Sequence, residues 1–298
     1  MTDPLAEVVS LLRPRAVYSK VIGGAGAWAV RYSAFGEPSF CTMLEGECTL
    51  AVDGQAPITL MAGDFVLMPS TPGFTMSALE TAEPVFVDPR LAPAPTDEIR
   101  HGRQDGPPDV RMLGGYFAFD SPDASLLASL LPTLLHVRDV GRLSVLVQFV
   151  REESIEAKAG RDLVLERLVE LLLIEALRST PGESAPPGLL RGLADPRLSV
   201  VLRHLHGDPA QPWTVAELAK KAALSRSAFF ERFLRAVGLP PMEYLLAWRM
   251  AVAKDLLARE DVGIAEVAER VGYGSASTFS TAFSRHVGQS PGRYARQH

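Results

Sequence analysis

The chain has 298 residues, 47% of them apolar, which is enough to bury two separate cores, and its 24 glycines and 23 prolines do not indicate disorder. Its formal net charge is −5, it lacks an apolar run long enough to span a bilayer, and it starts without a basic or apolar leader, so we expect a cytoplasmic protein with no membrane partner. Two cysteines are too few for a secreted disulfide framework or for a structural zinc site of several thiolates.

Residues 1–120 show the alternation and turn signals of an all-β domain. Short strands are expected at Ala27–Tyr32, Ser39–Leu44, Cys48–Val52, Ile58–Leu60 and Phe65–Met68. Turns with glycine separate them at intervals of about 8 to 12 residues, a spacing typical of a β-barrel or sandwich.

After Ser121 the apolar period becomes helical, so residues 121–180 are expected to form a helical connector. Apolar side chains fall on three helical faces: Leu126, Leu127, Leu130 and Leu131; Leu143, Leu146, Val147 and Val150; and Leu165, Leu168 and Leu172 with Glu175. The third face is spaced 3, 4, 3 and could form a short antiparallel seam in a homodimer, or it could pack against the barrel of its own chain. The sequence leaves both alternatives open.

Residues 181–192 are the predicted linker, because the run PGESAPPG at its start suits neither helix nor strand. Residues 193–298 then form a compact helical domain. From Leu193 onward there are 14 Lys and Arg against 10 Asp and Glu, whereas the rest of the chain has 16 against 25. Only the C-terminal part therefore suits a phosphate backbone.

The C-terminal domain contains the same pattern twice. Ala216, Glu217 and Ala219 return 49 residues later as Ala265, Glu266 and Ala268. Under an offset of 50, Ser225, Ser227, Phe229, Phe233, Arg235, Gly238, Pro241 and Tyr244 return as Ser275, Ser277, Phe279, Phe283, Arg285, Gly288, Pro291 and Tyr294. Each copy predicts a short helix, a tight turn and a longer capped helix, which is a helix-turn-helix unit.

Within each copy, the second helix has one buried face and one outward face. In the first copy Thr214 should cap a helix through Lys221, and Ser225 should cap the next, whose Phe229 and Phe233 point inward. The outward residues, which we predict to contact DNA, are Arg226, Ser227, Phe230, Glu231 and Arg235 in the first copy and Ala276, Ser277, Thr281 and Arg285 in the second. A spacer helix of about 17 residues, Met242–Ala258, should join the copies over about 25 Å.

The stretch from Trp213 to Met250, followed by the one from Ile264 to Arg296, resembles the DNA-binding domain of the AraC/XylS family of transcriptional regulators. The resemblance implies two recognition helices in successive major-groove segments on one face of double-stranded DNA, about 34 Å apart. The shorter spacer predicts that the DNA bends or that the domain flexes on binding.

Two positions depart from that family. Many members carry an arginine at positions 231 and 281, where it reads guanine, but this chain has Glu231 and Thr281. Glu231 could accept a hydrogen bond from cytosine N4, while Phe230, Ala276 and Thr281 could meet thymine methyl groups. Alternatively, Glu231 faces water or pairs with Arg235 at i+4.

The first domain, through its FCTMLEGECTLAVDG and LMAGDFVLMPSTPGF stretches, resembles the cupin-like sensor domain of some AraC/XylS regulators. Metal-binding cupins need His and carboxylate ligands, but the region from Val17 to Leu91 has no histidine, and Phe74 stands where a His is common. We therefore expect no metal, no cofactor and no catalytic residues. We expect instead a small organic effector, with Trp28, Phe40, Met43, Phe65 and Met68 as candidate pocket residues, although core packing is the stronger alternative for any one of them.

Cys41 and Cys48 fall on neighbouring strands of an expected hairpin that turns at Glu45-Gly46. That turn would place the two thiols near each other but not opposite. A redox-sensing disulfide is one alternative, and buried inert thiols are the other.

Together these patterns predict an α+β multidomain fold, with an N-terminal cupin-like β-barrel, a helical connector and a C-terminal all-α double helix-turn-helix domain. The predicted function is an effector-responsive, sequence-specific DNA-binding transcriptional regulator without enzymatic activity. The alternatives are a thiol redox regulator and a cupin enzyme fused to a DNA-binding domain.

Overall fold

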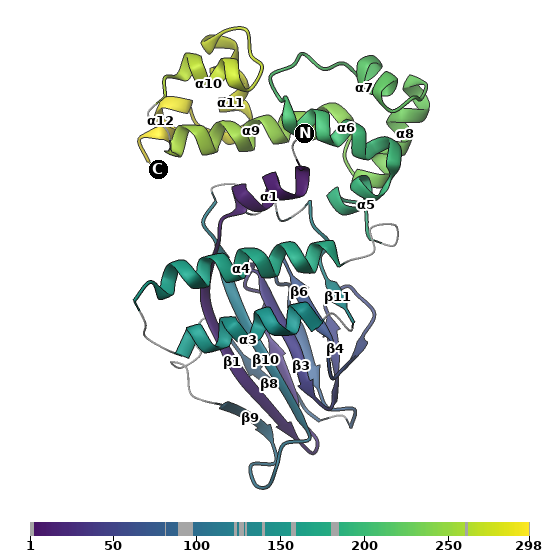
Figure 1. The fold of residues 1–298 in the computed structure, drawn as a ribbon, viewed down its shortest axis with the longest axis vertical. Coiled ribbons are helices and arrows are strands. Elements are labelled where there is room, and N and C mark those ends of the chain that lie inside the picture. Colours follow the sequence, from purple (N-terminus) through teal and green to yellow (C-terminus); the bar gives the residue numbers. More distant parts are fainter. Residues whose placement is uncertain are drawn as a thin grey trace. The chain divides into compact units, whose positions relative to one another are not determined.

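A computed structural model of the chain describes residues 3–80, 82–88, 98–121, 124, 128, 130–138, 141–155, 159–179, 185–259 and 262–297. The chain folds into two compact units (Figure 1). The barrel unit consists of Pro14–Phe119 and Pro132–Thr180, and the helical unit consists of Met1–Arg13, Asp120–Leu131 and Pro181–His298. The helical unit thus includes two segments that the sequence analysis placed with the barrel and the connector.

The barrel unit contains two β-sheets. The six-stranded sheet has the order β11-β6-β3-β10-β1-β9, and the five-stranded sheet has the order β5-β4-β7-β2-β8. The strands are β1 (Pro14–Ala25), β2 (Ala29–Tyr32), β3 (Ser39–Glu45), β4 (Glu47–Val52), β5 (Ile58–Met61), β6 (Phe65–Met68), β7 (Phe74–Ser77), β8 (Val85–Val87), β9 (Glu98–Gly102), β10 (Val110–Phe119) and β11 (Leu135–Val137).

The five strands expected from the sequence are confirmed as β2 to β6, to within a residue or two at their ends. Side chains from these strands and their neighbours form a core, in which Trp28, just before β2, Leu50 of β4 and Met76 of β7 are buried. Burial of such apolar surface is the main stabilising contribution to the unit.

The hairpin expected between Ser39–Leu44 and Cys48–Val52 is wrong. β3 pairs with β10 and β6, whereas β4 pairs with β5 and β7 in the other sheet. Between them Gly46 has φ +75°, and a Cβ there would lie 2.2 Å from the carbonyl oxygen of Asp109. This glycine lets the chain cross from one sheet to the other, so a turn signal marked a corner and not a hairpin.

Two helices, α3 (Gly141–Ile155) and α4 (Arg161–Arg178), pack against each other and against β1. They lie across the six-stranded sheet (Figure 1). Leu165 and Leu172 are buried in this contact, and Glu175 is partly buried and lies near Arg142 and Arg178. The predicted face therefore packs within its own unit. Of the first predicted face, Leu126 and Leu127 lie outside the described residues.

The helical unit contains α1 (Pro4–Leu12), α5 (Leu189–Ala194), α6 (Pro196–Gly207), α7 (Val215–Lys221), α8 (Arg226–Val237), α9 (Pro241–Arg259), α10 (Ile264–Arg270), α11 (Ala276–Val287) and α12 (Pro291–Ala295). The sequence analysis did not predict α1. Its apolar face, which includes Val8, Val9 and Leu12, packs on α6 and α9. Arg13 then forms an ion pair with Asp255 of α9.

Both predicted helix-turn-helix units are present, as α7–α8 and α10–α11. In the first, the rings of Phe229 and Phe233 pack in the core in a tilted arrangement, with 5.7 Å between their centroids; in the second, Phe279 and Phe283 pack in the same way at 5.4 Å. Equivalent aromatic pairs thus fix equivalent helix packing in the two copies. Among the helices that the structure describes, none is long and apolar enough to cross a membrane.

Candidate functional site

The start of each second helix is fixed by a side-chain cap. The backbone N–H of Ala228 donates to Ser225 Oγ at 3.3 Å, and that of Thr278 donates to Ser275 Oγ at 3.2 Å. In the first unit Thr214 and Glu217 also form a reciprocal capping box at the start of α7. These caps position the first turns of α8 and α11, where a recognition helix meets base edges.

On α8, all five predicted contact residues are exposed: Arg226, Ser227, Phe230, Glu231 and Arg235. Phe230 exposes 39% of its surface, a large fraction for an aromatic residue that lies among charged side chains. On the opposite face, Phe229 and Phe233 are fully buried. The exposed surface of the helix is therefore largely polar, with Phe230 and Leu234 as large apolar side chains on it.

Glu231 has no ion pair with Arg235 among the described residues. The ion pair on this helix instead joins Arg232 to Asp195, the residue before α6, with 2.5 Å between Nε and Oδ2. Asp195 also caps α6 by accepting from the backbone N–H groups of Arg197 and Leu198. The Glu231 carboxylate consequently remains directed to the exposed face of α8.

On α11, Ser277, Thr281 and Arg285 are exposed and Ala276 is partly exposed. The Thr281 hydroxyl donates to the carbonyl oxygen of Ser277 at 3.0 Å. The hydroxyl proton of Thr281 is therefore engaged within the helix. A hydrogen-bond acceptor, the hydroxyl oxygen, and the methyl group remain available to contact DNA. This face is less charged than that of α8.

Sequence reasoning missed one basic residue near this surface. Arg191 of α5 lines a shallow hollow together with Arg232 and Arg235. It lies in the stretch that was assigned to the linker, so the repeat pattern contained no signal for it.

The two recognition helices are held together by α9. This helix has 19 residues, a length of about 28 Å at 1.5 Å per residue. The Tyr244 ring packs against Phe233 of the first unit, and Met250 and Leu257 join the core of the second.

Arg249 of α9 strengthens this connection. It donates to the carbonyl oxygens of Pro209 and Gln211 at 2.8 and 2.9 Å, and its guanidinium lies 6.0 Å from the ring centroid of Tyr273. One side chain thus ties the loop before the first unit to the turn of the second. The contacts favour a rigid relation between α8 and α11.

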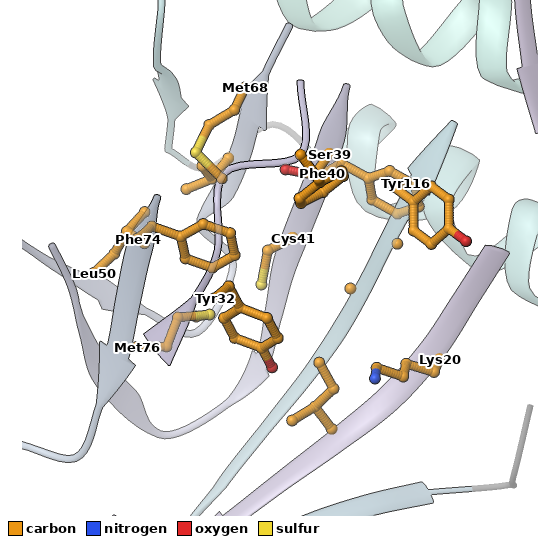
Figure 2. A pocket seen from close by; sticks show the side chains of 15 residues that line it. Lys20, Tyr32, Ser39, Phe40, Cys41, Leu50, Met68, Phe74, Met76 and Tyr116 are labelled. Carbon is orange, nitrogen blue, oxygen red and sulfur yellow. The ribbon is translucent and has the colours of Figure 1, made fainter. Parts of the chain in front are cut away.

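The barrel unit contains a cavity of about 80 Å³ (Figure 2). Its lining residues are Lys20, Ile22, Tyr32, Phe35, Ser39, Phe40, Cys41, Leu50, Val66, Met68, Phe74, Met76, Gly114, Gly115 and Tyr116. Of the five candidate pocket residues, Phe40 and Met68 line it. Trp28, Met43 and Phe65 are buried in the surrounding core and are not among the lining residues.

The cysteines are free thiols. Cys41 faces the cavity, and burial, followed by the nearby Cys48, raises its pKa. Burial raises the pKa of Cys48 to about 12, and its Sγ lies 3.7 Å from Met43 Sδ. Both thiols are therefore protonated at neutral pH, whereas reaction with oxidants requires the thiolate.

Two histidines each lie within hydrogen-bond distance of a polar side chain. His136 Nε2 lies 2.9 Å from Asp64 Oδ2, and His206 Nε2 lies 2.7 Å from the Tyr244 hydroxyl. Among the described residues, no group of three or more His, Cys, Asp or Glu side chains could hold a metal ion.

Comparison with known proteins gives matches over both units. Residues 3–180 match a family model described as "Cupin", and residues 218–297 match one described as "Helix-turn-helix domain". The chain is 38% identical to a putative AraC-like transcription regulator of Streptomyces lividans, over 99% of this chain and 98% of that protein. It is 37% identical to another of Streptomyces antibioticus, over 99% and 98%.

Among solved structures, the DNA-binding domain of AdpA in complex with a target DNA is 34% identical. The match covers 35% of this chain and 92% of that one, with a TM-score of 0.33.

Proposed function

The chain belongs to the AraC family of transcriptional regulators, and we propose that it reads one non-palindromic DNA site with α8 and α11 under the control of a small organic effector. The observation that carries the proposal is a pair of recognition helices with the same caps and the same buried phenylalanines but different exposed side chains. Because the caps and buried phenylalanines are the same, we expect both helices to enter the major groove in the same way. Because their exposed side chains differ, we expect them to prefer different bases.

In this proposal the residues have separate roles. Glu231 and Phe230 read bases from α8, and Ala276 and Thr281 read them from α11, with Ser227 and Ser277 beside them. Arg226, Arg235 and Arg285 contact phosphates, which adds affinity without sequence preference. Since bacterial DNA lies in the cytoplasm, we place the chain there.

The test compares Glu231→Ala with Arg285→Ala in the full chain, using a library of DNA sites. Loss of a base-reading carboxylate should change the preferred base at one position, where a good contact discriminates by about 1–3 kcal/mol. Loss of Arg285 should weaken all sequences similarly and reduce the salt dependence of binding. If both variants only lower affinity uniformly, the assignment of Glu231 is wrong.

For the effector, the supporting observation is an apolar cavity in the barrel unit with a few polar groups. A thermal-shift screen of metabolites against the full chain identifies ligands. Those that act through the cavity should also change DNA affinity, because coupling requires different binding to two states of the protein. A ligand that stabilises the protein without altering DNA affinity contradicts an effector role.

We also propose a homodimer. Its seam would not be the face of Leu165 and Leu172, which is buried within the unit, but the outer apolar residues of α3 and α4: Val145, Phe149, Leu163, Val164 and Leu171, each exposing 42–59% of its surface. Large exposed apolar surface of this kind is typical of an interaction site. Sedimentation that shows a monomer at micromolar concentration, with and without DNA, would exclude it.

We propose no enzymatic step. A cupin enzyme would require a bound metal, so metal analysis of the purified protein tests that alternative. A redox regulator would lose DNA affinity after oxidant as the thiols of Cys41 and Cys48 disappear; unchanged affinity with both thiols titratable would dismiss it.

A further inference from the structure

We infer that the hollow between α5, the start of α6 and α8 is a binding site for a backbone phosphate of DNA, which Arg191 and Arg235 hold. This inference rests on the proposed DNA-binding function and adds to it a contact from outside the two helix-turn-helix units. Three features support it: the charge of the hollow, the packing that fixes its walls, and its recurrence in the second repeat.

The lining of the hollow is basic. Its cationic side chains are Arg191, Arg232 and Arg235, and among the lining residues that the structure describes Asp195 is the one acid. The Asp195 carboxylate is already engaged by Arg232 and by two backbone N–H groups at the start of α6. Within the described part of the chain, neither Arg191 nor Arg235 forms an ion pair. The hollow therefore has an excess of two positive charges, which suits an anion from outside the chain.

Close packing of α5 fixes the position of Arg191. The next residue is Gly192, where a Cβ would lie 2.8 Å from Leu202 Cδ1 of α6 and 2.9 Å from Val237 Cγ2 of α8. Glycine at this position therefore lets α5 approach both helices, which it contacts (Figure 1). Because the backbone is held, only the arginine side chain loses freedom when it binds an anion.

The hollow adjoins the face of α8 that we propose to meet DNA. Arg235 belongs to both, since it is exposed on that face and also lines the hollow. A helix in the major groove has a phosphate backbone along each side, so cations beside the helix meet phosphates and not base edges. Arginine suits this contact because its planar guanidinium can donate two parallel hydrogen bonds to one phosphate.

The second repeat has a hollow at the equivalent place. It is lined by Leu246 of α9 and by Thr278, Thr281, Ala282, Arg285 and His286 of α11. Under the offset of 50 that relates the repeats, Arg235 corresponds to Arg285, and Arg232 corresponds to Ala282. A hollow with an arginine at the same position beside each recognition helix fits a partner whose charge repeats along its length. DNA is such a partner, whereas the surface of a folded protein is not.

The two hollows differ in charge. Among the described lining residues, Arg285 is the only arginine or lysine of the second hollow, whereas the first has three arginines. We therefore expect a stronger phosphate contact beside α8 than beside α11. Such a difference adds affinity at one half-site without adding sequence preference.

Arg191→Gln in the full chain tests the contact. DNA affinity at low salt should fall roughly 10-fold for all sequences alike, because a charge-assisted hydrogen bond is lost. The slope of log affinity against log salt should become shallower by about one, as for the loss of one phosphate contact. Arg191→Lys should keep the slope, since it keeps the charge. Arg103→Gln, in the exposed loop between β9 and β10, is the control for net charge.

DNA with single neutral phosphates locates the contact. Methylphosphonates are placed one at a time in and around the site that the full chain selects. At one position beside the α8 half-site, this change should weaken the wild type roughly 10-fold. It should leave the affinity of Arg191→Gln unchanged, because the two changes remove the same interaction. At the equivalent position beside the α11 half-site, the loss should be smaller and should be coupled to Arg285→Gln.

Two results would overturn the inference. One is an affinity and a salt slope of Arg191→Gln equal to those of Arg103→Gln, which would leave the hollow to an acidic partner other than DNA. The other is a scan in which no methylphosphonate position is coupled to Arg191. If the wild type still selects a site, both results leave the proposed function intact. A wild type that selects no site would instead contradict the proposed function itself.

Discussion

His206 is the residue whose protonation most directly affects the helical unit. It joins α6 to α9 through the hydrogen bond to Tyr244, and its ring centroid lies 3.9 Å from that of Trp248. Only 4% of its surface is exposed, and burial lowers its pKa from 6.5 to about 3. The folded state therefore holds a neutral imidazole.

This burial predicts acid sensitivity. Because the unfolded histidine binds a proton below pH 6.5 and the folded one does not, its contribution to stability is present above pH 6.5 and is lost as the pH falls toward 3. Between pH 7 and pH 5 the wild type should lose about 2 kcal/mol more unfolding free energy than His206→Gln, which cannot titrate. Urea unfolding at both pH values measures the difference; equal losses would contradict the assignment. His204→Gln, at the more exposed neighbouring histidine, is the control.

At the scale of elements, the two helix-turn-helix units differ at the turn position that has a positive φ. Gly272 of the second unit has φ +80°, and the equivalent residue of the first unit is Ala223, with φ +51°. A Cβ on Gly272 would lie 2.5 Å from the carbonyl oxygen of Ala210. The first unit thus tolerates a strained alanine where the second requires glycine.

Reciprocal substitutions should therefore have unequal effects on stability. Gly272→Ala should destabilise the helical unit by at least about 2 kcal/mol, because the left-handed conformation and the close carbonyl both oppose a methyl group. Ala223→Gly should change stability by about 1 kcal/mol or less, since relief of strain is offset by the greater entropy of the unfolded glycine. Denaturant midpoints measure both. A neutral Gly272→Ala would mean that the turn adapts and that the repeats are equivalent there.

Comparison of particular elements shows what the sequence can predict. The recognition helices are local: a capping serine and phenylalanines four residues apart specify α8 and α11, so both were predicted with their faces. The strands β2 to β6 were also found from alternation, but their partners were not. In the sequence, Gly46 looks like part of a hairpin turn. Whether it forms a hairpin or a corner between two sheets depends on its close contact with Asp109, which lies 63 positions further along the chain.

The cavity was less predictable for the same reason. Phe40 and Met68 line it, while Trp28 and Phe65, which look equivalent in the sequence, are core residues. Whether such a residue lines the cavity or lies in the core depends on where the two sheets move apart, which the sequence does not show. Lys20 was not singled out, because a lone lysine in a strand looks like a solvated side chain. The helix α1 was missed because its apolar face packs only against α6 and α9, which follow more than 180 residues later.

At the scale of the whole molecule, the rigid helical unit predicts bent DNA. The spacer α9 spans about 28 Å, whereas successive major-groove segments on one face are about 34 Å apart. Arg249 and the packing of α9 against both helix-turn-helix units oppose flexing of the protein. Circular-permutation gel shifts should therefore show a bend centred between the two half-sites, and straight DNA in the complex would count against it.

The central claim is that the two unequal recognition helices read one asymmetric site. Selection of binding sites by the full chain from random DNA, followed by footprinting, tests it most directly. The account predicts two unlike half-sites in adjacent major-groove segments, about 10 base pairs apart. A selected site with two identical half-sites, or with protection of only one groove, would contradict it.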